Sequence, residues 1–339
     1  MGRICALTVV AALAVACGGG SGSSPSSTSG SSSSNNPFGL SAGTLAFSAS
    51  PVAPETIRFI TPLGNLNPPG HTTPTDHIYF YFAAPDAGET PLGRRTAAFI
   101  PASGTISFLI GGQSTESKVM VQVTSNMWYY LDHVIPEIPV AVGTKVTAGQ
   151  RLGTTGLAYA LDLGVVNFDL RPAGIISPTR YTDETNHGDA PMKYFDEPIR
   201  SQLYSRVQRL GGDLEGKFDF DVAGRLVGNW FYEPGGAASM SFAYNTYDPS
   251  EVRIGIGGIP ITGVFAIAAG DPAPANVSVD TGIVRYTLTT SRTGPPLTGN
   301  TPIGTLLVQM VTPQRIQVEF FQGALSSASF TGNSRFFIR

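Results

Sequence analysis

The chain has 339 residues, a formal net charge of −3 at pH 7 and only 13% charged residues, so it lacks the basic footprint of a nucleic-acid-binding protein. Its two cysteines are Cys5 and Cys17, and Cys5 lies in a predicted signal, so internal disulfides, cysteine catalysis and cysteine-ligated metal sites are excluded. Forty glycines and 26 prolines between β-branched runs predict a mostly β protein, long enough for two domains.

The N-terminal segment has the pattern of a secretory signal. One positive charge, Arg3, precedes an apolar run over residues 4–16 that is too short to span a bilayer. The run ends in Leu13-Ala14-Val15-Ala16-Cys17, which resembles a bacterial lipobox. In that family the signal is removed before the cysteine, and the thiol is then lipidated. The resemblance therefore implies a signal peptide over 1–16 and lipidation at Cys17.

The next residues are almost pure Gly and Ser, which is typical of a flexible, solvated tether over 17–43. A tether directly after an anchor suits a domain that is held at a membrane surface. We expect the membrane to be a partner through the lipid, and we expect a place in the cell envelope. By resemblance to sorting rules, Gly18 after the cysteine favours the outer membrane or the cell surface.

The first folded domain is expected over 44–195. Its strands are predicted at 57–60, 77–82, 96–100, 104–110, 119–123 and 127–131. Residues 138–169 then predict a tight β-unit of strand, Gly turn, short strand, Gly turn and strand, with Gly143 and Gly149 at the reversals and the last strand beginning at Val165. Such a unit requires a larger sheet to be stable.

This unit resembles the LytM-type (lysostaphin-like) zinc metallopeptidases of bacterial cell walls. It is also similar to biotinyl or lipoyl carrier domains and to sugar-phosphotransferase domains. No Lys stands at the exposed turn where a carrier would hold its cofactor, and Thr154-Thr155-Gly156 offers no phosphate-accepting His. The absence of these residues argues against both alternatives.

The LytM resemblance extends to an ordered series of motifs over about half of the chain. From the N- to the C-terminus, sequences of this family contain the motifs H-x-x-x-D-[IVF]-A-A-P, an A-P-x-x-G-x-[VI] turn, Y-x-H-L, the glycine hairpin and H-x-H-[FL]-E. The matching segments are residues 77–85, 100–106, 130–134, 140–153 and 165–170. Their order and similar spacing imply a LytM-like duplicated hybrid motif.

The positions that carry chemistry in the family are mostly changed. The zinc ligands implied by the resemblance fall on His77, Tyr81 and Asn167, and the two assisting histidines fall on His133 and Val165. Zinc prefers imidazole, thiolate and carboxylate donors, whereas a phenol would have to lose a proton and an amide is neutral. We therefore expect a degenerate site with no metal cofactor, in which His133 is the one candidate for a catalytic residue.

Two further interpretations of this region stay open. His71 and Asp76 lie in the preceding loop and could rebuild a zinc site together with His77 and His133. The aromatic residues of 79–82 and 128–130 alternate along their strands, so half of them belong to the core. The other half could line the cleft as a surface for stacking glycan or peptide.

A connecting helix is predicted over 196–212, since apolar residues recur at Ile199, Leu203, Val207 and Leu210 before a Gly pair. Residues 213–339 then predict an all-β barrel or sandwich, with strands at 218–220, 225–232, 238–244, 252–256, 263–268, 282–289, 303–311, 315–321 and 334–338. Gly228-Asn229-Trp230 resembles the G-x-W start of lipocalin-like barrels, although a Trp that plugs a barrel end is the simpler interpretation.

These patterns together predict an all-β, lipid-anchored envelope protein with a catalytically degenerate LytM-like domain. Family members that lost zinc regulate other cell-wall enzymes, so the resemblance implies peptidoglycan or a cell-wall enzyme as the partner. One alternative is an active zinc metalloendopeptidase that acts on peptidoglycan with rearranged ligands. Another is a lipoprotein that binds a small ligand in its β-barrel.

Overall fold

The structure is a computed structural model that describes residues 36–67, 70–82, 95–156, 160–236, 238–290 and 301–339. The predicted signal peptide, Cys17 and most of the predicted tether lie outside these ranges. Within the described ranges, no helix combines the length and the apolar character needed to cross a membrane.

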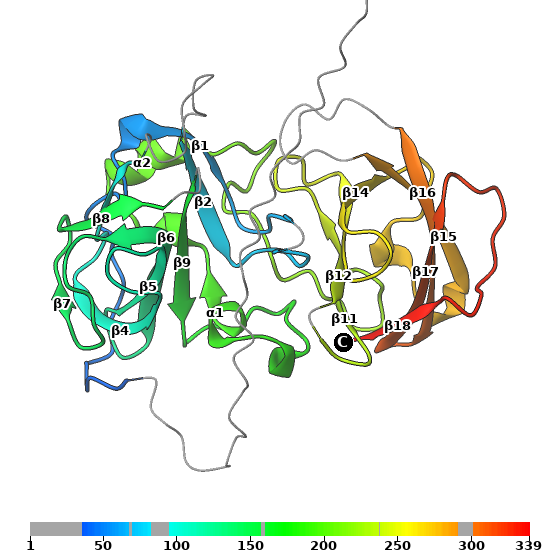
Figure 1. The fold of residues 1–339 in the computed structure, drawn as a ribbon, viewed down its shortest axis with the longest axis horizontal. Helices are drawn as coiled ribbons and strands as arrows, with labels where there is room; N and C mark the ends of the chain where they lie inside the picture. Colours follow the sequence, from blue (N-terminus) through cyan, green and yellow to red (C-terminus); the bar gives the residue numbers. More distant parts are fainter. Residues whose placement is uncertain (1–35, 68–69, 83–94, 157–159, 237, 291–300) are drawn as a thin grey trace, which may run out of the picture. The chain divides into compact units, whose positions relative to one another are not determined.

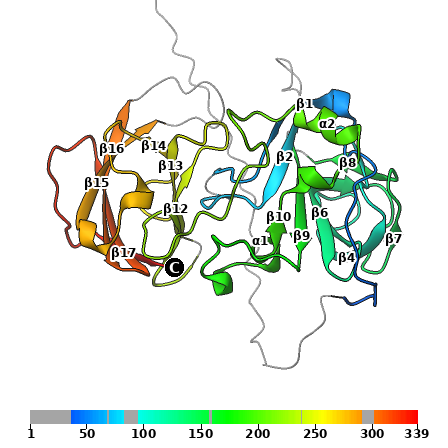
Figure 2. The same cartoon turned by 180° about the vertical axis from the view of Figure 1, so that it is seen from behind.

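Two β structures make up the described chain, and helices are short (Figures 1 and 2). The α-helices are α1 (Asp183–Asn186) and α2 (Ile199–Tyr204). Single turns of 3-10 helix cover Pro54–Thr56, Pro178–Arg180, Pro191–Tyr194, Pro274–Asn276 and Val279–Thr281. The predicted all-β fold class is therefore confirmed.

The first half forms one antiparallel sheet. Its strands are β1 (Ile57–Thr61), β2 (His77–Phe82), β3 (Ala97–Phe99), β4 (Gly104–Ile110), β5 (Ser117–Gln122), β6 (Met127–Pro136), β7 (Lys145–Val146), β8 (Arg151–Thr155), β9 (Ala160–Asn167) and β10 (Gly188–Asp189). The main path runs β1-β2-β9-β6-β5-β4-β7, while β3, β8 and β10 pair beside it. β9, far along the chain, thus lies between β2 and β6 (Figure 1).

Strand alternation sends one face of this sheet into an apolar core. On β9, Leu161, Leu163 and Val165 belong to that core, together with Ile78 and Phe80 of β2. The residues between them face the opposite side of the sheet. There, Met120, Tyr130 and Val166 form a small cluster against Trp128 and Phe168. This second face positions the candidate site.

The second half is a closed antiparallel barrel (Figure 1). Its strands are β11 (Gly228–Tyr232), β12 (Ser239–Tyr244), β13 (Val252–Gly257), β14 (Gly263–Ile267), β15 (Ile283–Thr290), β16 (Pro302–Thr312), β17 (Arg315–Gln322) and β18 (Arg335–Ile338). β11 pairs with both β12 and β18, which closes the ring. The predicted barrel is therefore confirmed, and the sandwich alternative is not the fold.

Large buried side chains fill the interior of the barrel. They include Trp230, Phe242, Tyr286 and Phe337, each with 0% of its surface exposed. The Trp230 indole donates from Nε1 to the Leu226 carbonyl at 2.8 Å. The Arg339 guanidinium lies 3.9 Å from the centre of the Trp230 ring. The Trp therefore plugs the barrel as the simpler interpretation predicts, and the filled interior counts against a ligand-binding barrel.

Several predicted elements differ from the structure. The helix predicted over 196–212 ends at Tyr204, because the β1 edge uses the backbone that follows it. Ile60 N–H donates to the Arg206 carbonyl at 2.9 Å, and Gln208 N–H donates to the Ile60 carbonyl at 3.1 Å. These tertiary hydrogen bonds take the place of further helical ones, so an apolar spacing of 4, 4 and 3 was not sufficient for a long helix.

The β-unit predicted over 138–169 also differs. Residues 137–144 form no strand, and Val142 is 61% exposed. The last strand begins at Ala160 rather than Val165. β6 continues past Asp132 to Pro136, because it leaves β9 there and pairs with β8. Residues 218–220 form no strand, since Phe218 packs into the core of the first half.

Candidate functional site

Three adjacent strands bring chemically active side chains onto the second face of the sheet. Register pairs His77 of β2 with Gly164 of β9, and Tyr79 with Asp162. On the other side of β9, Tyr130 of β6 lies opposite Gly164, and Asp132 lies opposite Asp162. Directly opposed residues share a face, so these side chains gather around the middle of β9.

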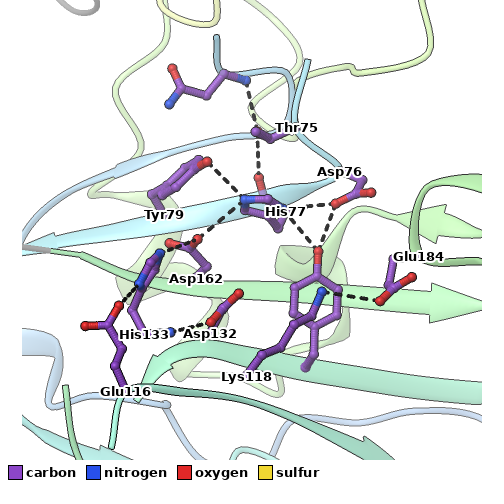
Figure 3. A network of polar contacts seen from close by, with 12 residues as sticks. Thr75, Asp76, His77, Tyr79, Glu116, Lys118, Asp132, His133, Asp162 and Glu184 are labelled. Atoms are coloured by element: carbon purple, nitrogen blue, oxygen red, sulfur yellow. Dashed lines mark hydrogen bonds and ion pairs between the residues drawn. The ribbon is translucent and has the colours of Figure 1, made fainter. Parts of the chain in front are cut away.

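The gathered groups form a chain of alternating acids and imidazoles, which we call the polar centre: Asp76, His77, Asp162, His133 and Glu116 (Figure 3). Asp162 Oδ2 lies 3.4 Å from His77 Nε2 and 3.6 Å from His133 Nε2. The far nitrogen of each imidazole meets another carboxylate. His77 Nδ1 lies 3.0 Å from Asp76 Oδ1, and His133 Nδ1 lies 2.5 Å from Glu116 Oε1.

Protein groups engage both ring nitrogens of His77. Nδ1 donates to Asp76 and lies 3.1 Å from the Tyr130 hydroxyl, while Nε2 lies 3.0 Å from the Tyr79 hydroxyl. Burial lowers the pKa of His77, but the hydrogen bond to Asp76 and the charge of Asp162 outweigh it, so the pKa is raised overall. The charged, doubly hydrogen-bonded imidazolium is therefore favoured.

Asp76 anchors the other end of this contact. Tyr130 donates its hydroxyl to Asp76 Oδ1 at 2.8 Å, and Thr185 donates to Oδ2. Burial alone would raise the pKa of Asp76, but the bonds from His77, Thr185 and Tyr130 hold it below its ordinary value. The carboxylate thus stays ionised and fixes the orientation of the His77 ring.

His133 sits where β6 leaves β9 and turns toward β8. Its backbone has a φ of +61°, a left-handed conformation that non-glycine residues seldom adopt. Asp132 Oδ1 accepts a bond from the His133 backbone N–H at 2.8 Å. Burial lowers the pKa of His133, yet the charge of Asp162 and the bond to Glu116 raise it overall. This local kink turns the imidazole onto the polar face.

Asp162 is the central group, although the sequence motifs do not point to it. Only 2% of its surface is exposed, and its Oδ1 atom is buried without a hydrogen-bond partner. Burial raises its pKa to about 6, although His77 and His133 act in the opposite direction. A lone acid in the apolar run 160–166 was the available signal, because one charge in a buried strand needs partners.

Tyr130 fills the space over Gly164, directly beside His77. A Cβ atom on Gly164 would lie 2.2 Å from the Tyr130 ring. The ring therefore covers the β9 position that faces His77, and its hydroxyl reaches His77 and Asp76. Burial raises the pKa of Tyr130 well above its ordinary value, so the phenol stays protonated.

Only some of the predicted site residues lie in the polar centre. His77, His133 and Asp76 lie in the polar centre, and the His71 ring centre lies 5.3 Å from that of His77. Burial and the positive charge of His77 lower the pKa of His71 to about 4. His71 is therefore a neutral imidazole beside a charged one.

Tyr81 and Asn167, the other two family metal positions, are engaged elsewhere. The Tyr81 ring stacks on Phe59 at 4.7 Å, and burial raises its pKa to about 12. Asn167 pairs with Met127 on β6, in the register of the core face, and donates to the Tyr194 hydroxyl at 3.3 Å. Residues 165 and 167, which the last motif aligned with the family histidines, therefore lie on the opposite face of β9 from His77.

As they are arranged here, the described side chains do not form a ready zinc site. In the described part of the chain, no group of three or more His, Cys, Asp and Glu side chains could hold a metal. The closest arrangement is His77, Asp162 and His133, but His77 Nε2 is already bonded to Tyr79. A catalytic zinc needs three free protein donors and an open fourth position.

His187 behaves differently from expectation. The polar stretch 182–189 predicts a solvated side chain, but His187 is only 5% exposed. Its Nδ1 lies 2.8 Å from the Leu170 carbonyl, and its ring lies 4.8 Å from that of Phe168. His187 thus packs against Phe168 and takes no part in the hydrogen bonds of the polar centre.

Comparison with known proteins gives solved structures only. No family model and no curated protein matches the chain. Csd3 of Helicobacter pylori is 14% identical over 44% of this chain and 35% of its own, with a TM-score of 0.30. A zinc-containing peptidase from Vibrio cholerae is 20% identical over 37% of each chain, with a TM-score of 0.28. The M23 protein EnpA of Enterococcus faecalis is 22% identical over 36% of this chain and 87% of its catalytic domain, with a TM-score of 0.25.

The Vibrio cholerae protein is a zinc-containing peptidase and EnpA is an M23 protein, so these neighbours agree with the LytM-type resemblance of the motif order. The chain spans only about a third of the length of the first two neighbours.

Proposed function

We propose that this chain is a lipid-anchored cell-envelope protein whose LytM-like domain binds peptidoglycan or a cell-wall enzyme without hydrolysing it. The observation that carries the proposal is the Tyr130 ring over Gly164. The ring fills the space over the β9 residue paired with His77, so no side chain can project toward His77 from position 164, and its hydroxyl is bonded to His77 and Asp76.

The chemistry of peptide hydrolysis supports the same conclusion. A LytM-type peptidase relies on a bound metal to acidify water and to polarise the scissile carbonyl. Here the family positions supply one imidazole, which is held by Asp76 and Tyr79, and a phenol whose pKa is raised to about 12. Neither group offers a free anionic donor near neutral pH.

An aromatic stack beside the polar centre offers a surface for binding. Phe59, Tyr81 and Tyr79 follow one another, with ring centres 4.7 and 5.8 Å apart. Phe59 and Tyr81 are partly exposed, whereas Tyr79 is buried. Flat, partly exposed rings suit the apolar faces of sugars or peptide groups, so this stack is the surface that we expect peptidoglycan to contact.

A binding assay and a metal analysis on one sample test the proposal. Purified cell walls should retain the chain, elemental analysis should find far less than one zinc per chain, and cross-linked wall peptides should stay intact. Tyr81→Ala should weaken retention, whereas Tyr232→Ala, a partly exposed tyrosine of the barrel, should not. Chelator-sensitive cleavage of these peptides would refute the proposal.

A metallopeptidase with rearranged ligands is the second candidate. Its specific support is the pair of imidazoles that face Asp162 at 3.4 and 3.6 Å, each backed by its own carboxylate. Carboxylates commonly orient metal-binding histidines in this way. One zinc per wild-type chain, lost in Asp162→Ala, would favour this candidate.

A further inference from the structure

The strand β4 is an edge that its neighbour β7 covers only in part. β7 pairs with Gly104 and Thr105 alone. The next residue, Ile106, exchanges backbone hydrogen bonds with Gly143 and Thr144 at 2.8 Å each. Within the described ranges, no strand pairs with residues 107–110 on that side, although β5 pairs with them on the other.

The uncovered part of β4 is apolar at its surface. Phe108 is 45% exposed and Ile110 is 57% exposed, and they alternate with the half-buried Leu109. Val142, in the segment that bonds to Ile106, is 61% exposed. Among the described residues, Val142 and Ile110 are the most exposed large apolar side chains.

Nothing in the local sequence protects this edge. Soluble proteins usually blunt free edges with Lys, Pro, bulges or a covering segment. Residues 104–115 contain no charge and no proline. The bulge in the β4–β5 pairing lies between Ile106 and Phe108, so Phe108, Leu109 and Ile110 keep a regular register.

The opposite edge of the same sheet, strand β1, is covered by another segment of the chain. Ile60 of β1 forms a parallel bridge with Val207, and the flanking backbone groups are bonded. The barrel has no free edge, because β11 pairs with β18. The apolar end of β4 thus differs from both the β1 edge and the closed barrel.

We propose that residues 107–110 pair with the same segment of a second copy of this chain, antiparallel about a two-fold axis at Leu109. In this register, Phe108 of each copy lies opposite Ile110 of the other, and Leu109 lies opposite its own mate. Because the segment is neutral, the symmetric pairing places no like charges together, and its backbone groups gain partners. The pairing does not depend on whether the domain binds peptidoglycan.

Sedimentation of the purified chain, with Cys5→Ser and Cys17→Ser to exclude lipid and thiol effects, tests the pairing. The parent should sediment as a dimer, and Ile110→Lys should be monomeric because it places two charges in the shared sheet. Ile283→Lys is the matched control, since Ile283 is 53% exposed on the barrel, and it should remain a dimer. A monomeric parent, or an Ile110→Lys dimer, would overturn the proposal.

Cross-linking tests the register. A mixture of Phe108→Cys and Ile110→Cys copies should form a mixed disulfide under mild oxidation, faster than either variant alone. Preferred Phe108→Cys homodimers would overturn the register about Leu109. Thermal melting checks that each variant folds, and Phe108→Thr, which keeps a strand-forming side chain, replaces Ile110→Lys if that variant is unfolded.

Discussion

The two halves of this protein both have an apolar core, and they differ in where ionisable groups gather. One face of the sheet in the first half is apolar, and on its other face two imidazoles and three carboxylates lie in contact with one another. The core of the barrel is built around Trp230, Phe242, Tyr286 and other apolar groups. Burying charge costs stability unless partners compensate it, whereas burying apolar area gains stability. We therefore expect the barrel core to contribute mainly stability, and the polar face of the sheet to carry specific chemistry.

Among the tests of this contrast, the largest change in stability is expected for Trp230→Ala. We expect it to lower the free energy of unfolding by about 3–5 kcal/mol, because it empties a fully buried site and removes the ring under Arg339. Urea unfolding measures the change. Trp128→Ala, on the half-buried cluster of the sheet, is the comparison and should cost clearly less; equal costs would erase the distinction between the halves.

The second test uses pH on Asp162. Its pKa rises from 3.8 when unfolded to about 6 in the folded chain, so ionisation disfavours folding. The associated stability is full below pH 3.8 and is lost as pH rises through 6, which corresponds to about 3 kcal/mol. The raised pKa values of His77 and His133 act with the same sign. Asp162→Asn should flatten the unfolding free energy between pH 4 and about 7; an unchanged slope would contradict the assignment.

The third test compares two buried phenols. The Tyr130 hydroxyl bonds to Asp76 and His77, whereas the Tyr286 hydroxyl in the barrel has no partner. Tyr130→Phe should therefore cost about 1–2 kcal/mol, and Tyr286→Phe should be neutral or stabilising. Thermal and urea unfolding of both variants measure the difference. The reverse order would show that the polar contacts of the sheet contribute nothing.

The smallest expected effect concerns Lys118. Its Nζ lies 3.3 Å from Glu184 and 3.9 Å from the centre of the Tyr130 ring. Lys118→Met keeps the apolar stem and should cost about 0.5–1 kcal/mol at low salt, and less at high salt. Lys217→Met, which removes a more exposed pair with Asp219, is the control and should cost less.

The sequence predicted the strands well, because period-2 patterns and Gly turns specify them locally. It placed β2 and the barrel strands β12–β17 within a few residues of their observed ends. The prediction failed where tertiary contacts determine the secondary structure. The backbone after Tyr204 is hydrogen-bonded to Ile60, and it therefore cannot continue α2. Local spacing carries no information about such a partner.

The site was predicted in part for a similar reason. His77 and His133 stand out as the rare imidazoles of a chain with four His, and both lie in the polar centre. Asp162 was missed because the last motif was aligned at Val165. In a strand, an odd shift in alignment moves every residue to the other face. Only the pairing of β9 with β2 and β6 reveals which residues face His77.

The placement of the two tryptophans has a practical consequence. The chain contains only Trp128 and Trp230, one in each half. Replacing either by Phe leaves a single tryptophan, whose fluorescence under selective excitation reports on one half alone. Stopped-flow refolding of the two single-Trp chains would then show whether ring closure of the barrel and assembly of the sheet occur together or in sequence.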